Sequence, residues 1–193
     1  TLVRVDTGNG TRTVIGTVDG LLSSNEFIRG LMIDPRSGAS YLMTRSFNDT
    51  QSRLYLFDLS NAQADLQAGV NNGETFRASA SAIDCRGRLY SVETSNPVGV
   101  GGRLYRVNRI DGSITLVGNT GYVSTLAHGP IDFDNASERL LGWVQAQSGA
   151  YIGYGSYSLS TGFFSVISTT PQLTLNAGAV NSRCWERFAD GFE

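Results

Sequence analysis

The stretch "GRLYRVNRIDGSITLVG", residues 102–118, has the pattern of two β-strands joined by a tight turn. Leu104 and Val107 before the turn favour strands, and "ITLV" after it is equally rich in strand-forming residues. Between them, "RIDGS" supplies Asp111 and Gly112, a pair typical of hairpin turns. The stretch therefore predicts an antiparallel β-hairpin.

The hairpin pattern recurs along the chain with a period of about 50 residues, which is in the range of propeller blades. The other copies are "LVRVDTGNGTRTVIG" (2–16), "RLYLFDLSNAQADLQAG" (53–69) and "YGSYSLSTGFFSVIS" (154–168). Superposing the turns aligns Asp6, Asp58, Asn108 and Ser158 in one column, and Gly10, Ala62, Gly112 and Gly162 in another. The repeat also assigns "SNAQADLQAG" (60–69), the best helix candidate by composition, to a strand.

A second repeating unit alternates with the first and places an aspartate at its turn. Its copies are "GLMIDPRSGASYLM" (30–43), "ASAIDCRGRLYSV" (80–92), "IDFDNASERLLGWV" (131–144) and a weaker "LNAGAVNSRCWERF" (175–188). Asp34, Asp84 and Asp134 recur at the same period of about 50 residues. We expect these aspartates to cap β-turns by accepting backbone N–H bonds.

Two such units make one four-stranded blade, and the chain has one hairpin left over at each end. Joining these hairpins would close a ring and protect the sheet edges. We therefore expect one all-β domain over residues 1–193, a four-bladed β-propeller. Its blades would span 30–70, 79–119, 128–168, and 174–188 together with 1–17. The alternative is a β-sandwich of two sheets.

The "LYRVN..DG..TLVG" pattern resembles repeats of the β-propeller superfamily, particularly bacterial extracellular ones. The resemblance covers nearly the whole chain and implies an architecture. It implies no activity, because this superfamily includes lectins, lyases, hydrolases and scaffolds.

Composition limits the function classes. The 193 residues are 40% hydrophobic and 17% charged, which suits one globular domain. The net charge of −2, without a basic tail, makes nucleic acid an unsuitable partner. No apolar run reaches the roughly 20 residues of a membrane helix. Low charge, a start at Thr1 without methionine and two cysteines fit a secreted protein, extracellular or periplasmic.

Cys85 and Cys184 lie in equivalent turns of their repeats. In an oxidising compartment we expect them to form a disulfide that ties the closing hairpin to the body of the domain. The alternative is two free thiols on opposite blades.

Catalytic and metal-binding motifs are scarce. The sequence contains one histidine, His128, and no lysine, so histidine-rich zinc sites and lysine chemistry are excluded. "DFDNASE" (132–138) alternates oxygen donors that suit calcium, but it is shorter than an EF-hand loop and lacks its glycine. We expect no cofactor, with calcium as the alternative.

Candidate ligand-binding residues come from the loops that enter the innermost strands. Each loop ends with a polar residue before a small one, and these polar residues are Arg29, Arg77, His128 and Asn176. Around a channel mouth, they would suit a carboxylate, a sulfate or an anionic or hydroxylated sugar. Alternatively, Arg29 and Arg77 pair with Glu26 and Glu74, three residues upstream of each.

A second set of loops adds an aromatic plane beside an amide. Trp143 and Gln145 form a combination that binds sugar rings, although a lone tryptophan is more often packed in a core.

The sequence therefore predicts a secreted, non-enzymatic binding module that recognises a carbohydrate, a small anion or a surface partner through one propeller face. Two alternatives stay open at this point. The first is a polysaccharide lyase or hydrolase-like enzyme that uses His128. The second is a structural protein of surface assembly.

Overall fold

The computed structural model describes residues 1–46, 51–71, 76–93, 102–122, 128–145 and 151–169. Within these ranges the regular structure is entirely β. No helix in the described ranges is long and apolar enough to cross a membrane.

The described strands form one two-stranded hairpin and three four-stranded antiparallel sheets. The hairpin contains β1 (Leu2–Val5) and β2 (Arg12–Gly16). Blade 1 contains β3 (Glu26–Ile33), β4 (Ser40–Ser46), β5 (Ser52–Asp58) and β6 (Gln63–Val70). Blade 2 contains β7 (Ala78–Ile83), β8 (Leu89–Glu93), β9 (Arg103–Val107) and β10 (Ile114–Asn119). Blade 3 contains β11 (His128–Asp134), β12 (Arg139–Gln145), β13 (Tyr151–Tyr157) and β14 (Phe164–Ser168).

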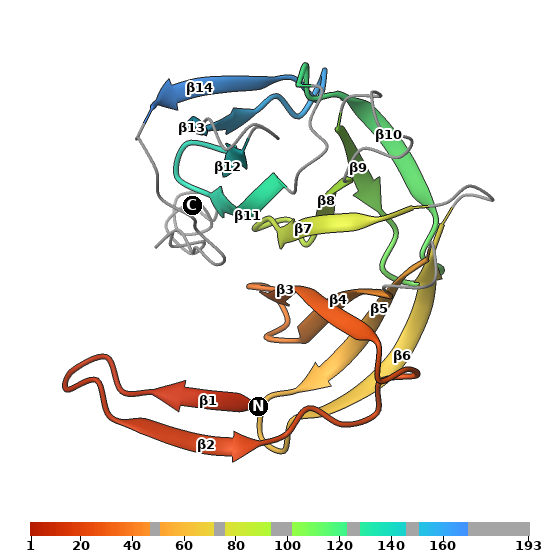
Figure 1. Ribbon diagram of the computed structural model, residues 1–193, viewed down its shortest axis with the longest axis vertical. Helices are drawn as coiled ribbons and strands as arrows, with labels where there is room; N and C mark the ends of the chain where they lie inside the picture. The colour runs from red at the N-terminus through yellow and green to blue at the C-terminus, as the bar shows by residue number, and fades with distance from the viewer. Residues whose placement is uncertain (47–50, 72–75, 94–101, 123–127, 146–150, 170–193) are drawn as a thin grey trace, which may run out of the picture.

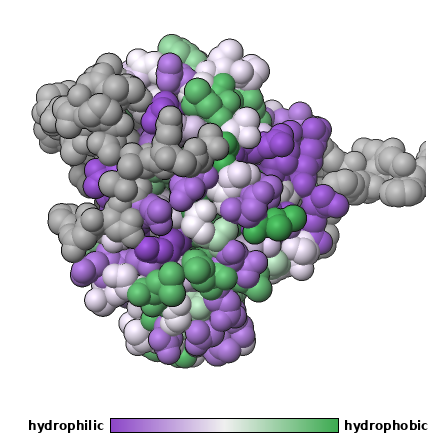
Figure 2. Space-filling model, turned by 90° about the vertical axis from the view of Figure 1, so that its right-hand side faces the viewer, coloured by the Kyte–Doolittle hydropathy of each residue, from purple (hydrophilic) through white to green (hydrophobic). Residues whose placement is uncertain are grey.

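The blades are arranged around a common centre (Figure 1). Their first strands, β3, β7 and β11, lie innermost, and β6, β10 and β14 lie at the outer edge. Outer strands mix exposed apolar residues, such as Leu66 and Leu116, with polar ones. Figure 2 shows the resulting face, on which hydrophilic and hydrophobic side chains are interspersed.

Turn chemistry explains why the hairpins form where the sequence predicts them. The second turn column adopts the left-handed conformation in all four copies, with φ of 74° at Gly10, 64° at Ala62, 73° at Gly112 and 75° at Gly162. Glycine adopts this conformation without steric cost, and alanine adopts it with strain. The strand over "QADLQAGV", β6, confirms the assignment made from the repeat.

The repeated aspartates cap their turns, as expected. Asp34, Asp84 and Asp134 each accept a hydrogen bond from the backbone N–H two residues later, at 3.0, 2.9 and 3.2 Å. The carboxylates thus replace backbone acceptors at the tight connection between the first and second strands of each blade.

Three apolar cores explain why the sheets stack as blades. One core joins blades 1 and 2 through residues such as Met43 and Leu89, and a second joins blades 2 and 3 through residues such as Tyr90 and Phe133. Blade 2 is therefore buried on both faces, and every residue of β7 is buried. A sheet that packs against a different sheet on each face is not part of a two-sheet sandwich, so the sandwich alternative is wrong.

The N-terminal hairpin lies beside blade 1. Leu2, Val18 and Leu21 pack against a third core that includes Tyr55 and Phe57. Asp19 also exchanges backbone hydrogen bonds with Ala62 and Ala64, at 3.1 and 2.9 Å. The expected closing segment, 174–188, lies outside the described residues, so closure of the ring by that segment stays a prediction.

Candidate functional site

Each inner strand contains a β-bulge near its start. The register shifts between Ile28 and Gly30 in β3, between Ala78 and Ala80 in β7, and between His128 and Ile131 in β11. A bulge bends the strand and redirects a side chain. In β3 the bulged residue is Arg29, one of the predicted ligand-binding residues.

Three arginines from two blades converge near this bulge. Arg45 lies on β4, opposite Phe27 of β3, and Arg77 immediately precedes β7. Burial, together with the positive charges of Arg29 and Arg77, lowers the pKa of Arg45 to about 10. We call Arg29, Arg45 and Arg77 the arginine cluster. Their side chains are half-buried, so water screens their repulsion incompletely.

The close approach of β3 and β7 brings the cluster together. At Gly30, the residue after the bulge, a Cβ atom would lie 3.3 Å from the backbone oxygen of Ser81. Glycine therefore allows the two inner strands to meet at the centre, and Arg29 and Arg77 approach one another from neighbouring blades.

Arg29 is held by an aromatic ring and keeps unused hydrogen-bonding capacity. Its guanidinium carbon lies 5.8 Å from the centre of the Phe27 ring, within the range of a cation–π contact. The Nε atom of Arg29 is buried and has no hydrogen-bond partner among the described residues. Burial lowers the pKa of Arg29. A ligand oxygen would satisfy such a donor.

The alternative considered for Arg29, a pairing with Glu26, is wrong. The fully buried Glu26 carboxylate instead accepts hydrogen bonds from Arg53 at 3.0 Å, Thr44 at 2.5 Å and Tyr55 at 2.9 Å. Three residues along a strand span about 10 Å, so Glu26 meets side chains of neighbouring strands before it meets Arg29. Glu74, the proposed partner of Arg77, lies outside the described residues.

A buried carboxylate also lies beside the cluster. Glu93, at the end of β8, accepts hydrogen bonds from Arg103 at 2.8 Å and Tyr105 at 3.4 Å, and its Oε1 atom has no partner in the described part of the chain. Burial raises the pKa of Glu93, although the charge of Arg103 opposes this shift. A hydrogen bond from the backbone of Arg77 connects Glu93 to the cluster.

Of the other predicted site residues, Trp143 is the one whose side chain the structure describes. Trp143 lies on β12 of blade 3, where its ring packs against Tyr154 with the centroids 5.4 Å apart. The registers place it at the position of Met43 and Val92, which are fully buried. This is the packed role of a lone tryptophan, although Trp143 stays partly exposed.

The remaining predicted residues lie partly or wholly outside the described part of the chain. His128 begins β11 and Gln145 ends β12, but their side chains are outside the described part. Asn176 and Cys184 lie entirely outside it. Their roles, and the pairing of Cys184 with Cys85, stay predictions.

Nor do the described residues contain a group of three or more His, Cys, Asp or Glu side chains that could hold a metal ion. In the segment considered for calcium, Asp132 accepts a bond from the N–H of Phe133, and Asp134 accepts bonds from Ala136 and Ser137. The calcium alternative stays untested.

Sequence reasoning missed Arg45 and Glu93. Arg45 lies near the end of β4, just before the loop that follows this strand. Because the repeat pairs this strand with the inner strand, the sequence could have placed Arg45 near Arg29. Glu93 and Arg103 occupy facing ends of β8 and β9, and their opposite charges were the available signal.

Comparison with known proteins gives similarity in structure alone. No protein-family model matches the chain, and no curated protein does. Among solved structures, TolB from Acinetobacter baumannii superposes with a TM-score of 0.50 at 14% identity, over 86% of this chain and 37% of that one. The fold is a β-propeller.

Two other similar structures have lower scores. The periplasmic gluconolactonase PpgL from Pseudomonas aeruginosa gives a TM-score of 0.47 at 15% identity, over 80% of this chain and 45% of that one. Regucalcin from Agrobacterium tumefaciens, a calcium-binding protein, gives 0.43 at 13% identity, over 75% and 44%. The chain thus spans less than half the length of these structures.

Proposed function

We propose that this propeller is a non-enzymatic binding module that recognises an anionic ligand, an acidic carbohydrate, at the arginine cluster. The observation that carries the proposal is the convergence of Arg29, Arg45 and Arg77 around the bulge of β3. Like charges held together in a partly buried site cost stability, and an anion would relieve that cost.

The types of donor favour carboxylate recognition. Guanidinium groups form planar, paired hydrogen bonds that match a carboxylate, and they keep their charge across the physiological pH range. The buried Nε of Arg29 is a donor, and no described residue accepts a hydrogen bond from it. Phe27 beside it is 47% exposed and offers an apolar surface for a sugar ring.

We place the protein outside the cytoplasm, in the periplasm or beyond the cell. Low charge and the cysteine pattern support this location. A disulfide between Cys85 and Cys184 belongs to the same proposal, because such bonds persist in oxidising compartments. Thiol titration of the unfolded, unreduced protein tests it: no reactive thiol supports the disulfide, and two reactive thiols contradict it.

Isothermal titration calorimetry with trigalacturonate tests the binding proposal. The fully methyl-esterified trisaccharide is the matched ligand control, because it keeps the sugar rings and loses the charges. Wild type should bind the acid at least ten times more tightly than the ester. Arg45→Gln and Arg29→Gln should each weaken binding of the acid by about tenfold or more, the loss of roughly one charged hydrogen bond.

Arg12→Gln is the protein control. Arg12 is an exposed arginine of β2, outside the cluster, and its replacement removes the same charge. Circular dichroism should show that all variants are folded. Equal affinity of wild type and Arg45→Gln for the acid, or equal affinity for acid and ester, would overturn the proposal.

A further inference from the structure

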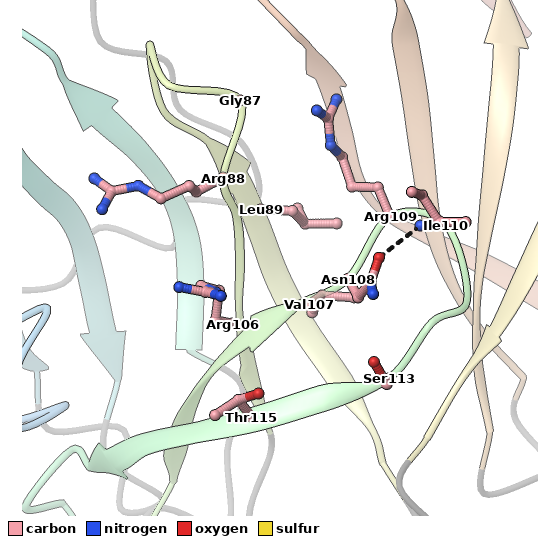
Figure 3. A pocket seen from close by; sticks show the side chains of 10 residues that line it. All are labelled: Gly87, Arg88, Leu89, Arg106, Val107, Asn108, Arg109, Ile110, Ser113 and Thr115. Carbon is pink, nitrogen blue, oxygen red and sulfur yellow. Dashed lines mark hydrogen bonds between the residues drawn. The ribbon is translucent and has the colours of Figure 1, made fainter.

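A second polar pocket lies at the other end of blade 2, away from the arginine cluster. The cluster lies near the starts of β3 and β7, whereas this pocket lies at the turns that connect β7 to β8 and β9 to β10. Its volume is about 470 Å³, which is within the range of small-molecule sites. Its polar lining comprises Arg88, Arg106, Asn108, Arg109, Ser113 and Thr115 (Figure 3).

Two of the three arginines are fixed by carboxylates. Arg88 pairs with Asp84 at 2.6 Å, and Arg109 pairs with Asp34 of blade 1 at 2.8 Å. The guanidinium carbon of Arg109 also lies 5.3 Å from the centre of the Tyr41 ring. These contacts hold the two side chains in place and neutralise their charges. Arg88 and Arg109 therefore shape the pocket but contribute little to its net charge.

Arg106 is the third arginine of the lining, and it differs from the other two in its contacts. It is exposed on β9, and in the described part of the chain no carboxylate pairs with it. Figure 3 shows Arg88, immediately before β8, and Arg106, on β9, extending in the same direction. Asp34 and Asp84 pair with the other two arginines, and Asp111 lies against Ser113, so Arg106 is the arginine of the lining that remains available to a ligand.

The neutral groups of the pocket offer donors, and one of their side-chain acceptors is already used. The Oδ1 atom of Asn108 accepts the N–H of Ile110 at 2.9 Å, so its Nδ2 group is left to donate. The Ser113 hydroxyl donates to Asp111 at 2.7 Å and keeps its lone pairs. The Thr115 side chain lies on β10 opposite Arg106. A ligand that meets these groups needs an anionic end and some hydroxyl groups.

We propose that this pocket binds a small hydroxylated monoanion of the sugar-acid class. Arg106 would bind the carboxylate, and Asn108, Ser113 and Thr115 would meet the hydroxyl groups. Leu89 and Val107, which also line the pocket, are almost fully buried in the core between blades 1 and 2. The site is separate from the arginine cluster in position and in residues, and it does not depend on the function proposed above.

Titration of ¹⁵N-labelled protein with sodium glucuronate, followed by amide chemical shifts, tests this inference. Saturable shifts should occur at Gly87, Ser113 and Thr115, which surround the pocket. Glucose at the same concentrations should leave these amides unshifted, because it lacks the charge. Arg106→Gln should weaken the glucuronate affinity measured at these amides by at least tenfold, whereas Arg12→Gln should leave it unchanged.

A double variant of the arginine cluster tests whether the two proposed sites bind independently. In the double variant Arg29→Gln/Arg45→Gln, the glucuronate shifts at Ser113 and Thr115 should persist with the wild-type affinity. Absence of saturable shifts at these amides in wild type overturns the inference, as do shifts that survive unchanged in Arg106→Gln. Neither result bears on trigalacturonate binding at the arginine cluster.

Discussion

Nη1 of Arg109 lies 2.8 Å from Oδ2 of Asp34, although the two residues are 75 positions apart and belong to different blades. The same carboxylate accepts the backbone N–H of Arg36 and the hydroxyl of Ser37, both at 3.0 Å. One buried side chain therefore stabilises the turn of blade 1 and links that blade to blade 2. Asp84, at the equivalent position, pairs with Arg88 of its own blade.

Asp34→Asn should lower the free energy of unfolding at pH 7 by about 1–3 kcal/mol, the cost of disrupting a buried charged hydrogen bond. Burial alone would raise the pKa of Asp34, but hydrogen bonds from Arg36, Arg109 and Ser37 together lower it. An acid with a lowered pKa stabilises the fold above its unfolded pKa, and this contribution disappears as the pH falls below about 4. Urea unfolding at pH 7, 5 and 3 should show the difference between wild type and variant shrinking.

Asp111→Asn provides the control for that measurement. Asp111 is an exposed turn aspartate whose hydrogen-bond partner in the described part of the chain is Ser113, within its own turn. Its replacement should cost less than Asp34→Asn at pH 7. A larger cost for Asp111→Asn would show that the turn cap, and not the link between blades, accounts for the effect.

Glu93→Gln should show the opposite dependence on pH. Burial raises the pKa of Glu93 in spite of Arg103, so the folded state holds this proton more tightly than the unfolded chain does. The corresponding stabilisation is complete below the unfolded pKa of about 4.3 and is lost as the pH rises through the folded value. Glutamine cannot titrate. The stability of Glu93→Gln relative to wild type should therefore increase between pH 4 and pH 7, and a decrease in chemical denaturation over that range would contradict this account.

Substitutions at two glycines with the same φ angle distinguish the cost of backbone strain from the cost of a steric clash. Gly38 and Gly112 both have φ of 73°. A Cβ atom at Gly38 would meet nothing within 4 Å, whereas one at Gly112 would lie 2.2 Å from the backbone oxygen of Gly69. Gly38→Ala should cost about 1–2 kcal/mol from the left-handed conformation, and Gly112→Ala should cost about 1–3 kcal/mol more because blade 1 must move away. Equal losses of stability in thermal unfolding would show that the backbone at Gly69 moves away from the new Cβ atom at little cost.

The sequence predicts the fold well because the repeat fixes local chemistry. The repeat position of Gly10 and Ala62 requires a left-handed backbone conformation, and the position of the repeated aspartates requires a side-chain acceptor. The residue type at each position therefore predicts a turn at that place in the chain. The site is harder to predict because the two arginines occupy different positions of the repeat: Arg29 precedes Asp34 by five residues, whereas Arg77 precedes Asp84 by seven. Arg29 lies at the fourth position of β3, whereas Arg77 precedes β7, so the two are not equivalent in the repeat although they converge in space.

Arg45→Gln should stabilise the ligand-free protein. The pKa of Arg45 is lowered to about 10, first by burial and then by Arg29 and Arg77, so Arg45 is charged at neutral pH but holds its proton less tightly in the folded state than in the unfolded chain. A base with a lowered pKa costs stability below its folded value, and that cost declines as the pH rises above about 10. Interactions between partly exposed charges are worth about 0.2–1 kcal/mol, and the gain in free energy of unfolding should lie near this range.

Salt distinguishes this repulsion from a change in packing. The gain from Arg45→Gln should be largest at low ionic strength and should shrink in about 1 M sodium chloride, where the screening length is about 3 Å. Arg45→Met, which keeps an unbranched apolar stem of similar character, should give a comparable gain if the charge is responsible. A loss of stability in both variants at every salt concentration would mean that the contacts of Arg45 outweigh its repulsion from Arg29 and Arg77. Stabilisation together with weaker binding of trigalacturonate would instead show that the protein retains an unfavourable charge cluster because the ligand needs it.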